Sequence, residues 1–308
     1  MGGDLQVESE KGNGSRFFFK LEFSTTDVAV LREVNRKIYI DQDALKGKTI
    51  LVVEDNEFNQ FIARSILEKW NTVADIASNG KLAIEKVRQK NYDLILMDMQ
   101  MPVMDGCTAT RVIRKELNVS TPVIALTAFA TKEAIDKALN AGMNDYIAKP
   151  FEEETLFGKI LSAFGIAPHY ISGSEASSQT ELTGIKKGLY YDLSKLSKLL
   201  GDDKAEIIDL IEKFIELTPE YSAELFTAYE QNNIEEVAKS AHKIKSSLEL
   251  LASGNLRSNI KLIHEYTRTK ENLEKLPKLM KYFRENIPVL LRQLSEKTAE
   301  MRDIKRKV

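Results

Sequence analysis

Three carboxylates, a hydroxyl and an ammonium group stand at the ends of short apolar runs, where they could form a metal site. Asp98 ends the run LILM, while Glu54 and Asp55 follow the run TILVV. Thr127 ends the run VIAL, and Lys149 follows DYIA. Packed carboxylates repel one another unless a cation joins them. Because a site made of oxygen ligands and water suits a hard ion, Mg²⁺ is the metal that these residues predict.

A histidine in the second half of the chain also has the setting for chemistry. His242 lies in AHKIKSSLELL, and at about 100° per residue it points roughly 130° away from the centre of the apolar stripe of its helix. Lys239, Lys245 and Ser246 fall near it on the same side. Nearby lysines lower the pKa of an imidazole and attract phosphate, which favours a neutral nucleophilic nitrogen at pH 7. From the helix alone, an exposed histidine without such a role is the alternative.

The segment that carries the acidic residues has a pattern that would bring them together. Short apolar runs alternate with stretches of helical spacing. The expected strands are residues 49–53, 73–77, 94–98, 122–127 and 145–148. This alternation predicts an α/β fold, a five-stranded doubly wound parallel sheet whose strands all end at one edge. The carboxylates, the hydroxyl and the ammonium group would meet in a crevice at that edge.

After residue 190 the pattern changes to helices. Apolar residues recur at helical spacing in segments 193–200, 207–226, 234–251, 256–263 and 276–294. The short connections predict an all-α antiparallel helical bundle, with a kink at Pro219 and an irregularity at Pro288. Residues 166–190 are rich in Gly and Ser and are expected to form a linker.

The composition is typical of a soluble globular protein of two domains. The chain has 308 residues and a formal net charge of -2, without a basic excess or a motif that would favour nucleic-acid binding. Its single cysteine excludes an internal disulfide and suits a reducing compartment. No apolar run approaches the roughly 20 residues that span a bilayer. We therefore expect a cytoplasmic protein that makes no membrane contact.

The block 48–165 resembles the receiver domain of response regulators, which has a flavodoxin-like fold. The motifs VVEDN, LILMDMQMPVMDG, VIALTA and DYIAKPF carry this resemblance in the order and spacing of the family. It implies that Asp98 accepts a phosphoryl group. It also implies that Glu54, Asp55 and the backbone carbonyl of Gln100 bind Mg²⁺ together with Asp98.

The same resemblance implies roles for three further residues. Thr127 and Lys149 would contact the phosphoryl oxygens, and Thr127 and Tyr146 would change their packing on phosphorylation. One alternative is that these residues are helix caps and surface charges. Another is a phosphatase of the haloacid dehalogenase type, which needs a second aspartate two residues after the first as a general acid. Gln100 stands at that position, so this alternative lacks its proton donor.

Residues 191–308 resemble a histidine-containing phosphotransfer domain, whose motif is H-x-x-K-G followed by a small residue. His242 and Lys245 stand at the first two named positions, and Ser246 replaces the glycine. The resemblance implies that His242 is a second phosphoryl acceptor with Lys245 beside it. Ser246 is small enough for a receiver to approach, and its added hydroxyl is expected to weaken docking slightly.

Two shorter features resemble parts of sensor histidine kinases. Residues 1–24 read as a β-hairpin similar to the end of the kinase ATP-binding domain, followed by a linker over 25–47. The asparagine-containing Mg²⁺ site and the glycine-rich lid of that domain are missing, so we expect no ATP binding. His264, in HEYTR, resembles a kinase phosphoacceptor, but the proline expected five residues later is Thr269. We expect His264 to be a surface or packing residue of the bundle.

Together these resemblances predict the C-terminal part of a hybrid sensor histidine kinase that acts in a phosphorelay. A phosphoryl group would pass from the histidine of an outside kinase to Asp98, then to His242, and then to a downstream response regulator. The reverse direction is equally allowed. The alternatives are a fragment whose parent is the ATP-dependent kinase, and a phosphate sink that loses its phosphoryl group by hydrolysis at Asp98.

Overall fold

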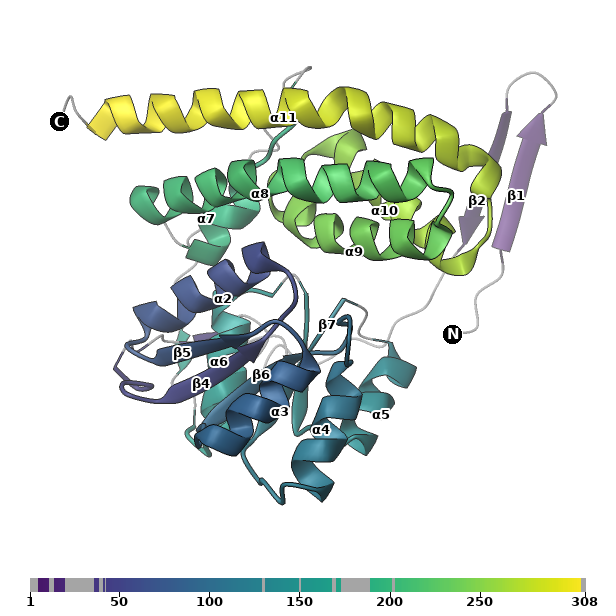
Figure 1. Cartoon of the computed structure of the whole chain (residues 1–308). Coiled ribbons are helices and arrows are strands. Elements are labelled where there is room, and N and C mark those ends of the chain that lie inside the picture. Colours follow the sequence, from purple (N-terminus) through teal and green to yellow (C-terminus); the bar gives the residue numbers. More distant parts are fainter. Residues whose placement is uncertain are drawn as a thin grey trace. The chain divides into compact units, whose positions relative to one another are not determined.

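The chain divides into two units, of which the first comprises residues 1–38 and 169–178 and the second comprises residues 39–168 and 179–308 (Figure 1). The computed structural model describes residues 5–10, 14–19, 36–38, 41, 43–128, 131–149, 151–167, 170–172, 189–200 and 203–305.

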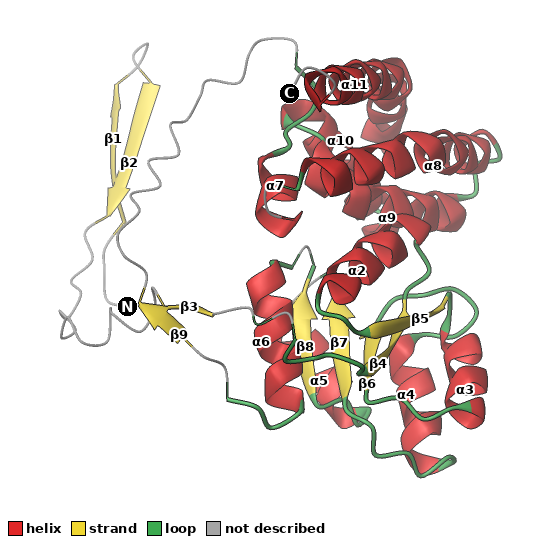
Figure 2. Ribbon diagram, turned by 90° about the vertical axis from the view of Figure 1, so that its left-hand side faces the viewer, coloured by secondary structure: helices red, strands yellow, loops and turns green. Residues whose placement is uncertain are grey.

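The first unit contains two antiparallel pairs of strands. β1 (Leu5–Glu10) and β2 (Gly14–Phe19) form a hairpin, as the sequence predicts. β3 (Arg36–Ile38) pairs with β9 (Tyr170–Ser172), although both segments were expected to lie in linkers (Figure 2). Strands of three residues are too short for their alternation to be recognised in the sequence. The other residues of the expected linkers lie mostly outside the described residues.

The second unit begins with a five-stranded parallel sheet in the order β5-β4-β6-β7-β8. Its strands are β4 (Thr49–Val53), β5 (Val73–Ala77), β6 (Leu94–Asp98), β7 (Val123–Thr127) and β8 (Asp145–Ala148). This confirms the expected fold class. After β4 the chain forms β5 on one side of it, and β6, on the other side of β4, is followed outward by β7 and β8. A crevice therefore forms between the carboxyl ends of β4 and β6, where such sheets bind ligands.

Helices cover both faces of this sheet. They are α2 (Glu57–Lys69), α3 (Gly80–Gln89), α4 (Gly106–Lys115), α5 (Lys132–Asn140) and α6 (Glu153–Ala163). Buried residues of α3 and α4 share one apolar core with β4, β6 and β7. On the opposite face, Trp70 at the end of α2 packs edge-on against Phe157 of α6, with ring centroids 5.0 Å apart.

Two small residues fix the backbone around the crevice. Asn56 caps α2, because its side-chain oxygen accepts hydrogen bonds from the N–H groups of Phe58 and Asn59. Gly106 begins α4 so close to the end of β6 that a Cβ atom there would overlap the carbonyl oxygen of Asp98. The absence of a side chain at Gly106 therefore lets α4 start directly behind Asp98.

The rest of the second unit is an all-α bundle, as predicted. Its helices are α7 (Ser194–Leu200), α8 (Lys204–Glu230), α9 (Ile234–Leu251), α10 (Gly254–Thr269) and α11 (Leu276–Lys305), with a 3-10 turn, η1 (Leu273–Lys275). Pro219 lies inside α8 and Pro288 inside α11, and neither divides its helix into two. Short connections join α8 to α9 and α9 to α10, and these neighbours pack side by side.

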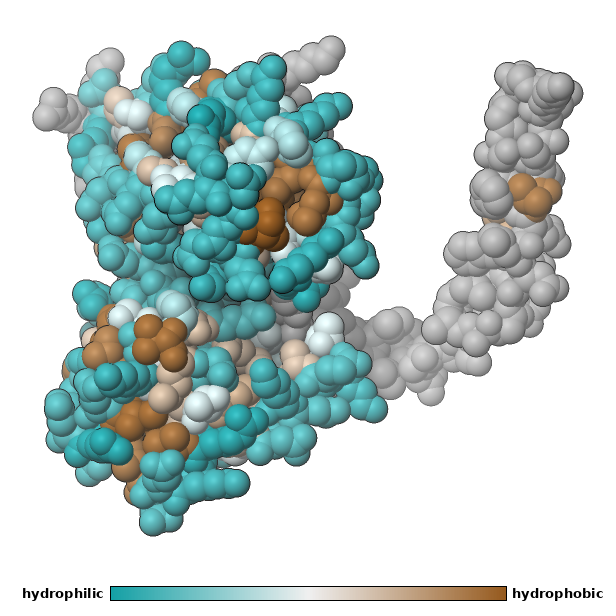
Figure 3. Space-filling view, turned by 45° about the vertical axis from the view of Figure 1, so that its right-hand side comes forward, coloured by the Kyte–Doolittle hydropathy of each residue, from teal (hydrophilic) through white to brown (hydrophobic). Residues whose placement is uncertain are grey.

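The face of the molecule drawn in Figure 3 is predominantly polar over its coloured residues. Figure 3 shows one face of the molecule, on which hydrophobic side chains form separate groups between hydrophilic ones. Within the described part of the chain, no helix is both long and apolar enough to span a membrane.

Candidate functional site

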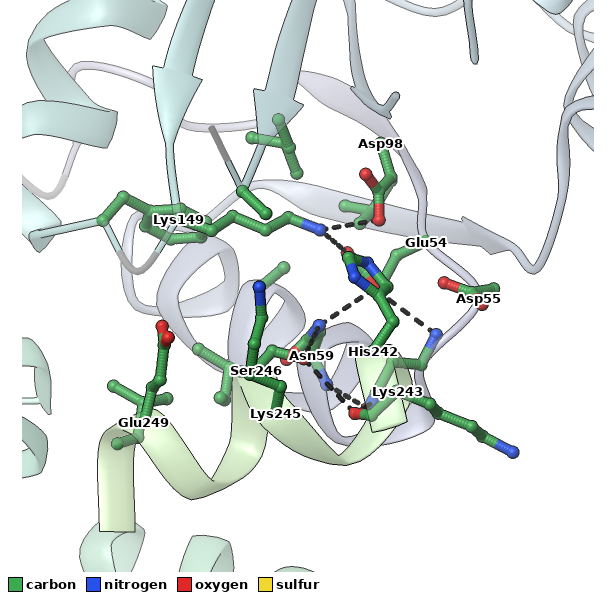
Figure 4. A pocket seen from close by; sticks show the side chains of 18 of the residues that line it. Glu54, Asp55, Asn59, Asp98, Lys149, His242, Lys243, Lys245, Ser246 and Glu249 are labelled. Carbon is green, nitrogen blue, oxygen red and sulfur yellow. Dashed lines mark hydrogen bonds and ion pairs between the residues drawn. The ribbon is translucent and has the colours of Figure 1, made fainter. Parts of the chain in front are cut away.

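The five predicted residues of the sheet edge come together, although not all of them face the pocket. Glu54 and Asp98 are 2% and 3% exposed, and Asp55 is half-buried. Lys149 reaches between them: its Nζ donates to Asp98 Oδ2 at 2.7 Å and also bonds to Glu54 Oε2 (Figure 4). Thr127 is buried at the end of β7, and its carbonyl accepts from the backbone N–H of Lys149 at 2.7 Å.

The three carboxylates carry more negative charge than the ammonium group of Lys149, which is bonded to two of them, can balance. Burial raises the pKa of Glu54 to about 7, against the attraction of Lys149 and with the help of Asp98. Burial and the charge of Asp98 raise the pKa of Asp55 to about 6. Burial disfavours the charged form of Lys149. The carboxylates of Asp98 and Glu54 outweigh the effect of burial, so the pKa of Lys149 is raised. A second cation would lower the free energy of the ionised cluster.

The acidic cluster fits the predicted Mg²⁺. Glu54, Asp55 and Asp98 each offer an oxygen, and these oxygens all lie within 4.8 Å of one another. All are oxygen ligands at a partly open crevice, as a hard ion that keeps water requires. The backbone N–H of Gln100 donates to Asp98 Oδ1 at 3.1 Å, so the loop that carries Gln100 turns beside the cluster. The role of its carbonyl as a ligand stays a prediction.

Mg²⁺ is expected to stabilise the fold more at pH 8 than at pH 5. Glu54 and Asp55 together bind more protons in the folded chain than in the unfolded chain between about pH 4 and pH 7, because both of their pKa values are raised. The stability contributed by these two groups is therefore complete at low pH and is lost as the pH rises through that window. Mg²⁺ binds the ionised forms, so at pH 8 a free concentration of 100 Kd should add about 2.7 kcal/mol.

Thermal unfolding with and without MgCl₂ at the two pH values measures this effect. At pH 5 protons compete with the ion and should weaken its apparent affinity by roughly a hundredfold or more, as linkage to two raised pKa values requires. Asp55→Asn is the matched variant, and it should reduce the stabilisation at pH 8. An equal increase in Tm at both pH values would contradict the assignment of these carboxylates to the metal.

Tyr146 does not line the pocket. It is half-buried on β8 and packs against the apolar core under α3 and α4, and Lys159 Nζ lies 5.4 Å from the centre of its ring. Leu126 and Ala128, which flank Thr127 in the chain, do line the pocket. The predicted coupling between Thr127 and Tyr146 therefore stays a prediction.

His242 lines the same pocket as the acidic cluster. It lies on α9 and enters the crevice that also holds Glu54, Asp98 and Lys149 (Figure 4). The face of α9 that was predicted to point away from the bundle core is therefore covered by the sheet domain. Lys245 also lines the pocket and is 6% exposed. The sequence identified both parts of this site but not their contact.

The imidazole of His242 is held neutral. Burial, followed by the charges of Lys245 and Lys149, lowers its pKa to about 4. Its Nδ1 is buried and has no hydrogen-bond partner among the described residues. His264 packs against it, with ring centroids 5.1 Å apart, and is itself 5% exposed. His264 is thus a packing residue, one of the two roles expected for it, and its contact with His242 was not predicted.

The contact between the sheet domain and the bundle has an apolar centre. Phe58 of α2 meets Phe214 of α8 edge-on, with ring centroids 5.7 Å apart, and each is 1% exposed. At the far end of α2, Lys69 pairs with Glu206 at 2.7 Å and donates to the carbonyl of Leu200 at 2.8 Å. Near the pocket, the Nδ2 groups of Asn56 and Asn59 donate to α9.

Comparisons with known proteins agree with the resemblance of the sheet domain to receiver domains. Residues 50–161 match the family model of the response regulator receiver domain. The aerobic respiration control sensor protein ArcB of Escherichia coli (strain K12) is 31% identical over 250 residues, which cover 80% of this chain and 31% of ArcB. The autoinducer 2 sensor kinase/phosphatase LuxQ of Vibrio harveyi is 38% identical over 156 residues, which cover 50% of this chain and 18% of LuxQ.

The chain therefore spans less than a third of the length of these two curated relatives. Among solved structures, the receiver domain of the sensor histidine kinase PA1611 from Pseudomonas aeruginosa PAO1 is 40% identical. That structure has a magnesium ion coordinated in its active site cleft. The similarity covers 39% of this chain and 98% of that one, with a TM-score of 0.37.

Proposed function

We propose that this chain, which contains a response regulator receiver domain and is homologous to hybrid sensor kinases, is a phosphorelay protein that transfers a phosphoryl group between Asp98 and His242. The observation that supports this most is their shared pocket. A carboxylate with a bound ammonium group and a neutral imidazole face each other there, and each is a chemically suitable acceptor. Such a transfer needs little more than positioning and neutralisation of charge.

Transfer to His242 forms one bond to phosphorus and breaks another. A lone pair on a ring nitrogen of His242 forms a new P–N bond to the phosphoryl group on Asp98, and the other nitrogen keeps its proton. The P–O bond to Asp98 breaks, and the carboxylate leaves with the electron pair. Lys149 then lies beside the negative charge of that carboxylate and of the phosphoryl oxygens. The neutral state of the imidazole makes its lone pair available at pH 7.

The receiver residues would support this step together with Mg²⁺. Glu54, Asp55 and Asp98, with the carbonyl of Gln100, would hold the ion, which supplies positive charge to the phosphoryl oxygens when bound. The partners that we propose are an outside histidine kinase, which loads Asp98, and a downstream response regulator, which unloads His242. The single cysteine suits the cytoplasm, which is the compartment that we propose.

Loading the full chain with labelled acetyl phosphate tests this function. The wild type should carry label on both residues, Asp98→Asn on neither, and His242→Gln on Asp98 alone. An acyl phosphate is lost in alkali and a phosphohistidine is retained, so alkaline treatment distinguishes the two sites. Label that reaches His242 in Asp98→Asn would disprove the proposed order. Label that never reaches His242 in the wild type would favour the phosphate sink.

A further inference from the structure

A continuous chain of hydrogen bonds joins the carboxylate of Glu54 to the backbone of α9. Asn59 Nδ2 donates to Glu54 Oε1 at 2.9 Å and to Ser246 Oγ at 3.3 Å. Ser246 Oγ in turn donates to the carbonyl of Lys243 at 3.3 Å. The same carbonyl accepts from Asn56 Nδ2 at 2.5 Å (Figure 4). The receiver and the bundle are therefore joined by polar groups next to the reacting residues.

Ser246 is the residue on which this chain of bonds depends. A hydroxyl has one donor and two acceptor sites, so it can accept from Asn59 while it donates to Lys243. The amide of Asn59 has two N–H groups, and both are used. Glycine, the residue of the phosphotransfer motif at this position, would break the link between Asn59 and the bundle. The hydroxyl that was expected to weaken docking therefore makes a contact with the chain's own receiver.

On the basis of the proposed function, we propose that Asn59 and Ser246 form a specificity-determining pair. The pair favours docking of the bundle on its own receiver over docking on receivers that lack an asparagine at the corresponding position. It thereby sets how the phosphoryl group on His242 divides between Asp98 and an outside receiver. Ser246 acts through docking in this proposal, so it is a positioning residue.

The division of labelled phosphoryl groups between Asp98 and an added outside receiver reports directly on the pair Asn59 and Ser246. Transfer to Asp98 requires the docked state, and transfer to an added receiver requires the undocked state. Their ratio therefore follows the docking equilibrium, even where nearly all molecules are docked. Loss of one uncharged hydrogen bond should shift that ratio roughly three- to tenfold. The added receiver is one without an asparagine at the position of Asn59.

Four variants of the full chain, loaded with acetyl phosphate, make the test. Ser246→Ala and Asn59→Ala should each move the division of label toward the added receiver by roughly three- to tenfold. The double variant should equal either single variant, because the same interaction is lost. Ser258→Ala removes an exposed hydroxyl on α10 and is the matched control, with no expected shift.

Two results would overturn the pair. One is a shift of less than twofold in both single variants, and the other is a double variant whose shift equals the product of the two. Asn59→Ala also removes a contact of Glu54, so Mg²⁺ affinity is measured in each variant, and Ser246→Ala should leave it unchanged. Failure of the proposed function would look different, because the wild type itself would then carry no label on His242.

Discussion

Replacing Lys149 with glutamine should lower both the loading of Asp98 and its transfer to His242 by roughly 10²- to 10³-fold. Lys149 is the cation bonded to Asp98 and Glu54, and it is largely buried in the pocket. Without it, negative charge on the phosphoryl oxygens and on the leaving carboxylate loses its fixed partner. The buried carboxylate of Glu54 also loses the charge that favours its ionised form, so its pKa should rise further.

Single-turnover labelling measures both rates in the variant. Lys159→Gln is the matched control, because Lys159 forms its ion pair with Asp145 at 2.7 Å and is not among the residues that line the pocket. That variant should stay within about twofold of the wild type, since an ion pair at the surface, such as this half-buried one, contributes little. If Lys149→Gln reacted within tenfold of the wild type, the proposed role of the ammonium group would be wrong.

Truncating Phe58 should release the bundle from the receiver. Phe58 is buried against Phe214, at the apolar centre of the contact between α2 and α8. Burial of a phenylalanine side chain is worth about 1.5–3 kcal/mol, so Phe58→Ala should weaken docking by roughly ten- to a hundredfold. His242 would then be accessible for a larger fraction of the time. Its rate of reaction with diethyl pyrocarbonate, followed by mass spectrometry of the modified peptide, should rise by up to the same factor.

The control must separate docking from the stability of the receiver. Ile113→Val shortens a fully buried side chain of α4, in the core on the other face of the sheet. It should cost roughly 0.5–1.5 kcal/mol of unfolding free energy and leave the reactivity of His242 unchanged. An equal increase in reactivity in both variants would mean that loss of receiver stability, and not undocking, exposes the imidazole.

The receiver part of the site could be predicted because its geometry follows from topology. Parallel strands end at one edge, so a carboxylate after β4 and another at the end of β6 must meet once the strands are recognised. Glu54 and Asp98 do so, and Lys149 at the end of β8 bonds to both. Thr127 shows the limit of this reasoning, because its side chain is not among those that line the pocket.

The contact between the two domains could not be predicted, because its residues have local roles that hide it. Asn56 follows two acidic residues and precedes a helical pattern, so a helix cap accounts for it completely, and it does cap α2. The Nδ2 group of Asn56, which the cap does not use, nevertheless donates to the carbonyl of Lys243, 187 positions further along the chain. Phe58 likewise reads as a core residue of its own helix. The periodicity of one segment carries no information about which distant surface covers it.

His242 lines the crevice that a histidine from another protein would have to enter to reach Asp98. On the proposed relay, arrival of a phosphoryl group from outside and its passage inward are mutually exclusive events. The chain must therefore alternate between two arrangements in every cycle. At saturating kinase, the rate of phosphoryl transfer through the chain would no longer depend on donor concentration. The rate at which the bundle separates from α2 would then set its maximum.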